Sequence, residues 1–295
     1  MAKRILFIVN LRSGKGTIKN HLADILDIMI KAGYEVTVYT TQCQGDAIQK
    51  TIDETVNYDR IICSGGDGTL DEVVSGMMQL EERKPIGYIP AGSTNDFGNS
   101  IGIDKDMLIA ARISISDKLF PCDVGLFNSE SFVYVAAFGL FTEVSYSTSQ
   151  DLKNVLGHAA YIIEGAKQLR DIKSYKMQIE YEGNVIYDEF IFGMVTNSKS
   201  VGGFKGIIQG NIDLCDGLFE ITLIKRPKNP IEFNEILAYM TGVINDTEML
   251  YSFQTSEIKI TAKEEVPWTC DGEFGGNHQV VTVRNAHKAL EIAIE

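Results

Sequence analysis

The first 125 residues alternate short apolar runs with stretches whose apolar residues recur at helical spacing. Apolar runs of strand length lie at 4–9, 35–40, 60–64 and 85–90. Helical patterns occupy 23–33, 46–56 and 69–79, and a further helix is expected near 104–112. Strands that alternate with helices form a parallel sheet with helices on both faces. The sequence therefore predicts a doubly wound, parallel α/β domain.

From about residue 122 the pattern changes to alternating apolar and polar residues, which is typical of strands with one buried face. Such runs lie at 176–181, 218–224, 256–261 and 279–284. Turn dipeptides such as Glu182-Gly183 and Asp271-Gly272 separate the runs. Helices are expected near 152–173 and 231–245. This half should be mainly antiparallel β structure.

The sequence shows no low-complexity linker and no internal repeat between the two halves. We therefore predict a nucleotide-binding type of α/β domain over 1–122 and a β-rich substrate domain over 123–295. The last few residues of the chain could return to the first domain. Without a linker, the two domains should pack closely with a cleft between them.

Composition narrows the class of protein. The chain has 295 residues and is 44% hydrophobic, so it can bury a substantial core. Its longest apolar run, 132–141, is well short of the roughly 18 residues that span a bilayer, and the N-terminus has no cleavage site. The five cysteines form no CxxC pair and the four histidines do not cluster, so a reducing cytoplasm fits best. The net charge of −13 argues against broad nucleic-acid binding, and any membrane contact must be local.

The loop "NLRSGKGT" follows the first predicted strand. Its glycines allow close approach of a ligand to the backbone, and Lys15 adds positive charge. A Walker A loop would have glycine where Val9 stands and Ser or Thr where Gly16 stands, so this is not a P-loop. A flexible connection with a solvated lysine explains the loop equally well.

The stretch "CSGGDGTLDEV" follows the third predicted strand. Thr69 and Glu72 have the spacing of a capping box, so a helix should begin just after the glycines. Gly65, Gly66 and Gly68 let the backbone wrap an anion, and the helix dipole favours phosphate. A simple glycine turn is the alternative.

Asp67 lies among these glycines and brings a negative charge to a loop suited to anions. A carboxylate beside a polyphosphate is repulsive unless a cation lies between them. Mg²⁺ that bridges protein carboxylate, water and phosphate is the usual solution. Asp67 therefore indicates a magnesium-bound nucleotide.

Further aspartates mark other candidate positions. Asp96 lies in the loop "IPAGSTNDFGNSIG" and Asp123 in "FPCDVG"; each alone suits a turn or a helix cap, but together with Asp67 they form an acidic cluster. Asp271 is expected at the tip of a hairpin, which structure alone would explain. Asp213 and Asp216 could cap a strand or bind a hard cation.

The motifs together resemble a known family. "NLRSGKG", "SGGDGTLDEV", "IPAGSTNDFGNSIG", "CDVG", "DLCDGLFEI" and "CDGE" occur in this order along nearly the whole chain. The combination resembles the diacylglycerol kinase catalytic family, in particular the bacterial soluble lipid kinases. "GGDGT" alone is shared with NAD kinases and, more loosely, phosphofructokinases, whereas "PAGSTND" and "CDGE" are typical of the lipid kinase branch. Leu11, where the family has proline, and Ser93, where it often has threonine, are mild departures.

The resemblance implies a two-domain kinase with ATP and Mg²⁺ as cofactors. Positions that match nucleotide contacts are Asn10, Leu11, Arg12, Ser13, Gly14, Thr41 and Ser93. Positions that match the phosphate-binding stretch are Gly66, Asp67, Gly68, Thr69, Leu70, Asp71 and Glu72. An aspartate, water and Mg²⁺ network is matched by Asp67, Asp96 and Asp123. A separate structural Mg²⁺ site is matched by Asp213, Asp216 and the carbonyl of Leu218.

Asp271 matches the family's general base, which would take the proton of the lipid's primary hydroxyl as it attacks the γ-phosphate. This role requires the "CDGE" hairpin to fold over the cleft. The implied reaction converts diacylglycerol to phosphatidic acid. The implied protein is a cytoplasmic homodimer that contacts the inner membrane face transiently and peripherally.

Several alternatives stay open at this point. Another lipid alcohol, such as a sphingoid base or ceramide, could be the acceptor, because acceptor pockets are read mostly by shape. A soluble-metabolite kinase such as NAD kinase, or a non-catalytic nucleotide-binding protein, would use the same first half. Lys167, Arg170 and Lys173 recur at three-residue spacing and could meet anionic lipid, although a solvated helix face is the alternative.

Overall fold

The computed structural model describes residues 2–140, 172–198, 213–240 and 242–295. The helix expected near 152–173 falls almost entirely outside these residues, and so do Lys167 and Arg170. Among the helices that are described, none is long and apolar enough to cross a membrane.

The described chain folds into two compact units. The first comprises the chain up to Val124 together with Glu130–Val133 and Ala286–Glu295, and the second comprises Gly125–Ser129 and Tyr134–Asn285. The observed division lies two residues after the predicted boundary at 122/123. The chain end belongs to the first unit.

The first unit is built on a parallel sheet. Its strands are β1 (Lys3–Val9), β2 (Tyr34–Thr40), β3 (Arg60–Gly65) and β4 (Ile86–Pro90), in the spatial order β2-β1-β3-β4. Each neighbouring pair is parallel, and the end of β13 (Glu273–Ala293) adds to β4 in parallel, with Ile292 opposite Ile86. The strands predicted for this half are confirmed.

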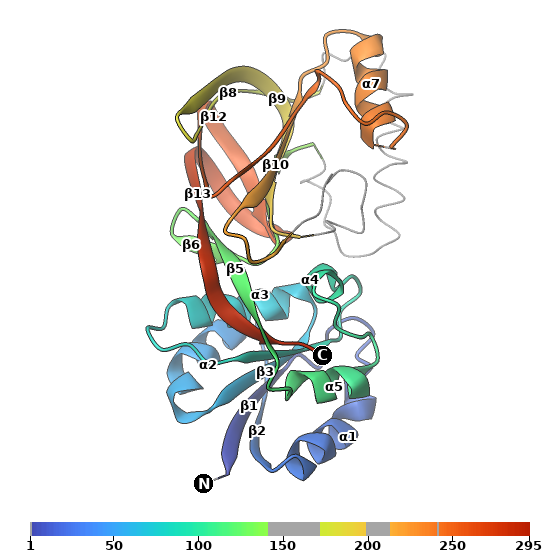
Figure 1. Cartoon of the computed structure of the whole chain (residues 1–295), viewed down its shortest axis with the longest axis vertical. Helices are drawn as coiled ribbons and strands as arrows, with labels where there is room; N and C mark the ends of the chain where they lie inside the picture. Colours follow the sequence, from blue (N-terminus) through green and yellow to red (C-terminus); the bar gives the residue numbers. More distant parts are fainter. Residues whose placement is uncertain (1, 141–171, 199–212, 241) are drawn as a thin grey trace. The chain divides into compact units, whose positions relative to one another are not determined.

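Helices cover both faces of this sheet (Figure 1). On one face lie α1 (Ile18–Lys31) and α5 (Met107–Ser114), and on the other lie α2 (Asp46–Glu54) and α3 (Asp67–Met78). The short helices η1 (Thr55–Asn57) and α4 (Asp96–Ser100) complete the unit. Because β1 is sandwiched between helices, its residues 5–9 are fully buried, as a doubly wound fold requires.

The predicted capping box at the start of α3 is wrong. The helix begins at Asp67, so Thr69 already lies within it. The Thr69 hydroxyl accepts a hydrogen bond from the Asn10 side chain at 3.2 Å instead of capping the helix. The Glu72 carboxylate accepts from the backbone N–H groups of Gly45 and Ala47, at 2.8 and 3.0 Å. Glu72 therefore caps the neighbouring helix α2, where its negative charge also favours the helix dipole.

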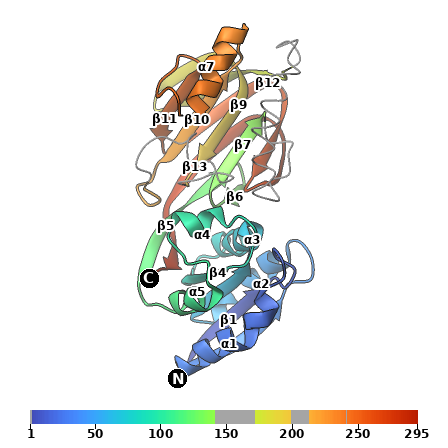
Figure 2. The same ribbon diagram turned by 90° about the vertical axis from the view of Figure 1, so that its right-hand side faces the viewer.

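The second unit is mainly antiparallel (Figure 2). Its strands are β7 (Val135–Gly139), β8 (Tyr175–Tyr181), β9 (Asn184–Thr196), β10 (Phe219–Lys225), β11 (Leu250–Thr255), β12 (Glu257–Cys270) and most of β13. Along the sheet the order is β11-β10-β9-β7-β12-β13, and β8 pairs with both β9 and β12. The helix expected over 231–245 is observed as α7 (Pro230–Met240). The strands β5 (Leu119–Phe127) and β6 (Glu130–Phe132) pair with each other, and β5 also pairs with β13.

Trp268, the only tryptophan in the sequence, lies in the core of the second unit. It is 1% exposed, and its ring lies 5.2 Å from Phe127 and 4.9 Å from Phe138, measured between centroids. Aromatic packing of this kind adds to the stabilisation from apolar burial. The core therefore joins β5, β7 and β12.

The two hairpin turns predicted from dipeptides are confirmed. Glu182 and Gly183 connect β8 to β9 with φ values of 45° and 79°. Asp271 and Gly272 connect β12 to β13 with φ values of 50° and 86°. Positive φ at both central residues is the turn geometry that matches the twist of antiparallel strands.

We predict that Glu72→Ala destabilises the first unit. The change leaves two N–H groups of α2 without their charged acceptor, which should lower the free energy of unfolding by about 1–2 kcal/mol. Urea denaturation followed by circular dichroism measures the effect. The control is Glu81→Ala, which removes an exposed glutamate from the loop after α3 and should change stability by less than about 0.5 kcal/mol. Equal urea midpoints for the Glu72→Ala and Glu81→Ala proteins would contradict the capping role of Glu72.

Candidate active site

The strand order of the first unit marks a switch point between β1 and β3. From β1 the chain continues to β2 on one side, whereas β3 and β4 lie on the other side. Ligands of open α/β sheets bind outside the carboxyl ends of the strands at such a point. The loop 10–17 follows β1 and the loop at Gly66 follows β3. Both predicted glycine loops therefore begin at this position.

Backbone hydrogen bonds hold the loops together beyond the strand ends. The N–H of Asn10 donates to the carbonyl of Ser64 at 2.8 Å, and the N–H of Ala91 donates to the carbonyl of Gly65 at 2.8 Å. The loops after β1, β3 and β4 thus meet as a continuation of the sheet.

Two of the loop glycines are required by this packing. A Cβ on Gly92 would lie 2.5 Å from the Cα of Gly66, which leaves no room for a side chain. A Cβ on Gly14 would lie 2.5 Å from the carbonyl oxygen of Ala91, and Gly14 also has a φ of +55°. These glycines therefore allow the loops to approach each other.

Gly68 differs, because nothing in its surroundings requires a glycine. A Cβ there would have no heavy atom within 4 Å, and the residue is exposed in the first turn of α3 with helical geometry. Glycine lowers helix stability, so a glycine at a helix position with room for a side chain needs an explanation other than packing. Close approach of a ligand to the backbone at the helix N-terminus supplies one. The N–H groups of Thr69 and Leu70 already donate to the carbonyl of Gly66, at 3.0 and 3.2 Å, so a ligand would approach the turn before them.

Asn95 and Tyr88 fix the loop after β4. Asn95 has a φ of 53°, and its side chain exchanges hydrogen bonds with the backbone of Gly92, at 3.0 Å in each direction. The Tyr88 hydroxyl donates to the carbonyl of Gly65 at 3.2 Å. Burial, and then the negative charge of Asp67, raise the pKa of Tyr88 well above its ordinary value. Tyr88 therefore remains a protonated donor, a role that the sequence did not reveal.

Asp67, the first residue of α3, has a structural role in addition to any metal role. Its carboxylate accepts from the N–H groups of Asp96 at 3.2 Å and Phe97 at 3.4 Å. Its charge therefore lies at the N-terminus of α4 and ties the loop after β3 to the loop after β4. Each carboxylate oxygen has two lone pairs, so a carboxylate in this position can accept backbone N–H groups and also interact with water or a metal ion.

Asp96 and Asp123 are both buried, at 2% and 0% exposure. Asp123 lies within β5, so the turn or helix-cap interpretation of it is wrong. Its carboxylate accepts from Nδ1 of His287 at 3.1 Å and from the N–H of Lys288 at 2.7 Å. Residues near the C-terminus thus supply hydrogen-bond donors to the buried Asp123 carboxylate of the first unit.

A metal site made wholly of protein side chains is not preformed in the described part of the chain. There, no three or more His, Cys, Asp or Glu side chains are grouped as metal ligands. A nucleotide-bound Mg²⁺ takes only one or two protein carboxylates and completes its shell with phosphates and water. The chemistry of Asp67 and its neighbours therefore fits a magnesium-bound nucleotide.

The remaining predicted nucleotide positions lie after strands of the same sheet, and Thr41 directly follows β2. The Asn10 side chain accepts from the N–H of Arg12 at 3.0 Å, and the N–H of Thr41 donates to the carbonyl of Val9 at 3.0 Å. Ser93 is exposed in the loop after β4. Leu70 is 1% exposed, so its side chain packs in the core and leaves only its backbone for a ligand.

Asp271 lies at the tip of the β12–β13 hairpin and is 6% exposed. One carboxylate oxygen, Oδ1, accepts from the N–H groups of Tyr134 at 3.0 Å and Val135 at 2.9 Å. Its own N–H donates to the carbonyl of Val135 at 2.8 Å. These bonds fix the carboxylate against the start of β7, and two donors on one oxygen stabilise its ionised form.

The loop that contains Asp213 and Asp216 precedes β10. The Asp213 carboxylate accepts from the N–H of Cys215 at 3.2 Å, and the Asp216 carboxylate accepts from the N–H of Leu218 at 2.9 Å. The carbonyl of Leu218 accepts from the Asn285 side chain at 3.4 Å. Both aspartates therefore stabilise their own loop, as in an Asx turn.

Comparison with known proteins decides the family. Residues 4–127 match the diacylglycerol kinase catalytic domain, and residues 135–294 match the YegS C-terminal NAD kinase beta sandwich-like domain. A protein named diacylglycerol kinase from Bacillus subtilis (strain 168) is 36% identical over 93% of this chain and 91% of its own length. The chain belongs to the diacylglycerol kinase family. It is therefore a kinase.

A second relative and a solved structure extend the comparison. A protein of that name from Staphylococcus carnosus (strain TM300) is 36% identical over 94% of this chain and 90% of its own length. A crystal structure from Bacillus anthracis (strain Sterne) has a TM-score of 0.84 at 24% identity and covers all of this chain and 98% of its own. At that identity the structure supports the fold alone, a mixed α/β protein with a sheet-rich C-terminal region.

We predict that Gly68→Ala weakens nucleotide binding without harming the fold. The added methyl group enters open space, so the melting temperature should stay the same or rise slightly. Affinity for ATP should fall by about tenfold because the methyl group stands where the ligand approaches the backbone. Calorimetry and thermal denaturation measure the two quantities.

Gly92→Ala is the comparison variant, because its methyl group would collide with Gly66. We expect it to lower the melting temperature and ATP affinity together. If Gly68→Ala binds ATP as tightly as the unaltered protein, the helix N-terminus does not contact the nucleotide.

Proposed function

We propose that this kinase transfers the γ-phosphate of ATP to the primary hydroxyl of diacylglycerol and forms phosphatidic acid. The observation that carries the proposal is the 36% identity over 93% of the chain to a protein named diacylglycerol kinase. Membership of a kinase family favours ATP as the donor.

In this proposal the loops of the first unit bind the nucleotide. Residues 10–14, Thr41 and Ser93 contact the nucleoside part, and the stretch 66–72 receives the phosphates at the N-terminus of α3. Mg²⁺ would neutralise charge that develops on the phosphates, and Asp67, Asp96 and Asp123 would hold it directly or through water. Asp213, Asp216 and the carbonyl of Leu218 are proposed to hold a separate structural Mg²⁺.

Asp271 is the proposed general base. Its carboxylate accepts the proton of the lipid hydroxyl while the hydroxyl oxygen bonds to the γ-phosphorus and the bond to the leaving ADP oxygen breaks. A fixed, ionised carboxylate suits this step, since phosphoryl transfer depends mainly on positioning. The backbone bonds from Tyr134 and Val135 supply that rigidity.

The proposed substrate also determines where in the cell the enzyme would act. A protein that acts on a membrane lipid must contact the bilayer, so we propose transient peripheral binding at the inner membrane face from the cytoplasm. We also propose a homodimer, as the family resemblance implies. A different lipid alcohol is the second candidate acceptor.

Labelled ATP tests the proposed reaction directly. With diacylglycerol present and purified protein, label should appear in the lipid extract and run with phosphatidic acid. A panel that includes ceramide and a sphingoid base ranks the acceptors. Label that stays in the aqueous phase with NAD as acceptor would contradict a lipid kinase.

We predict that Asp271→Asn abolishes most turnover while the hairpin remains intact. The asparagine side-chain oxygen can still accept from Tyr134 and Val135, but the amide cannot take a proton. Activity should fall by about 10²-fold or more, with the melting temperature within a few degrees of the unaltered protein. Thr269→Ala, on the same hairpin, is the control and should retain activity. Near-normal turnover by a folded Asp271→Asn protein would exclude the base role.

We predict that Asp67→Asn raises the Mg²⁺ concentration needed for half-maximal activity. The amide oxygen can still accept a backbone hydrogen bond, whereas the lost charge weakens any metal interaction. The shift should be about tenfold or larger. An unchanged Mg²⁺ titration would restrict Asp67 to its role as an acceptor for Asp96 and Phe97.

A further inference from the structure

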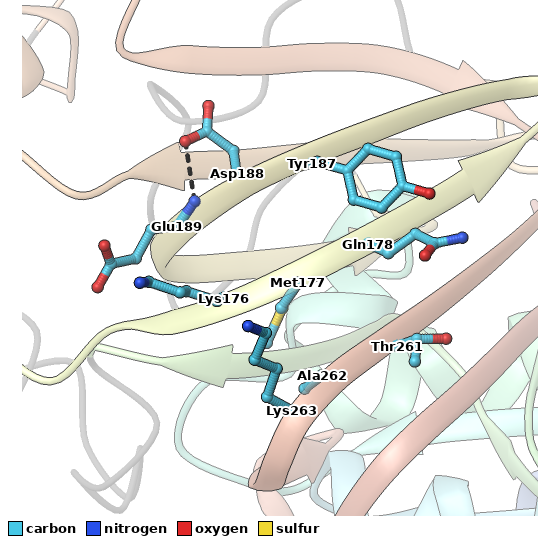
Figure 3. A pocket seen from close by; sticks show the side chains of 9 residues that line it. All are labelled: Lys176, Met177, Gln178, Tyr187, Asp188, Glu189, Thr261, Ala262 and Lys263. Atoms are coloured by element: carbon cyan, nitrogen blue, oxygen red, sulfur yellow. Dashed lines mark hydrogen bonds between the residues drawn. The ribbon is translucent and has the colours of Figure 1, made fainter.

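The second unit contains a pocket of about 450 Å³ between the neighbouring strands β8, β9 and β12 (Figure 3). Its volume is within the range of small-ligand sites. No residue predicted to bind nucleotide or metal, or to act as base, lines it. The pocket therefore needs a separate explanation.

Strand register gives one side of the pocket a row of polar groups. Gln178 on β8 is directly opposite Tyr187 on β9 and Thr261 on β12, so these side chains share one face of the sheet. Figure 3 shows their polar ends on one side of the pocket and the ammonium groups of Lys176 and Lys263 on the other. The lining thus presents hydrogen-bond donors from all three strands.

The acidic residues in the lining already have cationic partners from outside it. Glu189 pairs with Arg226 at 2.7 Å and also accepts from the Ser174 hydroxyl. The hydrogen bond from Ser174, and then the bond and charge of Arg226, lower the pKa of Glu189. Asp188 pairs with Lys225 at 3.9 Å. Each of the two carboxylates therefore has a cationic partner outside the lining.

In the described part of the chain, the two lysines in the lining make no ion pair of this kind, although the charge of Lys176 also lowers the pKa of Glu189, which is directly opposite it on β9. Within the described residues, neither Lys176 nor Lys263 makes an ion pair, although the chain has a net charge of −13. Lys259, on the same strand as Lys263, does pair with Glu180. Tyr187, on the other side of the pocket, is 71% exposed. The pocket thus combines positive charge with an exposed aromatic ring.

We propose that this pocket binds the phosphate of an anionic phospholipid headgroup and docks the second unit on the bilayer. Ammonium and hydroxyl groups are the donors that phosphate oxygens accept. An exposed tyrosine and two lysines around one pocket suit the membrane interface, where the ring enters the headgroup layer and the lysine stems cover apolar surface. The docking role rests on the proposed function, in which the substrate is a membrane lipid.

Vesicle sedimentation without nucleotide tests the proposal. The unaltered protein should sediment with vesicles of phosphatidylglycerol and phosphatidylcholine, and much less with phosphatidylcholine alone. The double variant Lys176→Glu/Lys263→Glu should bind the anionic vesicles at least about 30-fold more weakly, given the usual contribution of each lysine near a charged surface. The control, Lys105→Glu/Lys228→Glu, changes the net charge equally at two exposed lysines elsewhere and should bind like the unaltered protein.

Three results would overturn the proposal. The pocket variant could bind anionic vesicles as the control does. Inorganic phosphate could raise the melting temperature in a manner that depends on Lys176 and Lys263 while vesicles fail to bind, which would indicate a soluble phosphate ester. The pocket variant could change from dimer to monomer in sedimentation velocity, which would assign the surface to a second copy.

The same protein variants distinguish a failure of the docking proposal from a failure of the proposed kinase reaction. Turnover of a short-chain diacylglycerol dispersed in water should be unaffected in the pocket variant. Loss of vesicle binding with turnover retained supports the docking role. Vesicle binding by a protein that phosphorylates no lipid would instead contradict the lipid kinase reaction.

Discussion

One carboxylate joins the loops on which the candidate nucleotide site depends. Asp67 begins α3, yet it accepts the backbone N–H groups of Asp96 and Phe97 from the loop after β4. Those bonds hold together loops whose backbones already meet so closely at Gly66 and Gly92 that no side chain fits. The charge that looks out of place in a glycine-rich loop is therefore part of its architecture. If Asp67 also holds magnesium, as proposed, loop organisation and metal binding would depend on the same carboxylate.

Local patterns predicted the fold well because they reflect local geometry. Alternation of strands and helices predicted the parallel sheet of the first unit, and the dipeptide at Asp271 and Gly272 predicted a turn with positive φ at both residues. The capping box failed for a related reason. Thr69 and Glu72 have the right spacing, but residues distant in sequence, Asn10 and Gly45, compete for their side chains.

Long-range contacts in the candidate site could not be predicted in this way. Asp123 is satisfied by His287, which is 164 residues away in sequence and lies in no recognisable motif. Tyr88 appeared to be an ordinary apolar residue of a buried strand, and only the fold shows its hydroxyl on the Gly65 carbonyl. Conversely, the position of Asp271 at a hairpin tip was predicted, but the two backbone donors that fix its carboxylate depend on β7.

The most direct measurement is calorimetric titration of the unaltered protein with a non-hydrolysable ATP analogue, with and without Mg²⁺. If the glycine loops and Asp67 are built for a metal-bound nucleotide, the analogue should bind markedly more tightly with Mg²⁺ than in the presence of a chelator. Equal affinity under both conditions would contradict the account, because Asp67 would then oppose the phosphates with no cation between them.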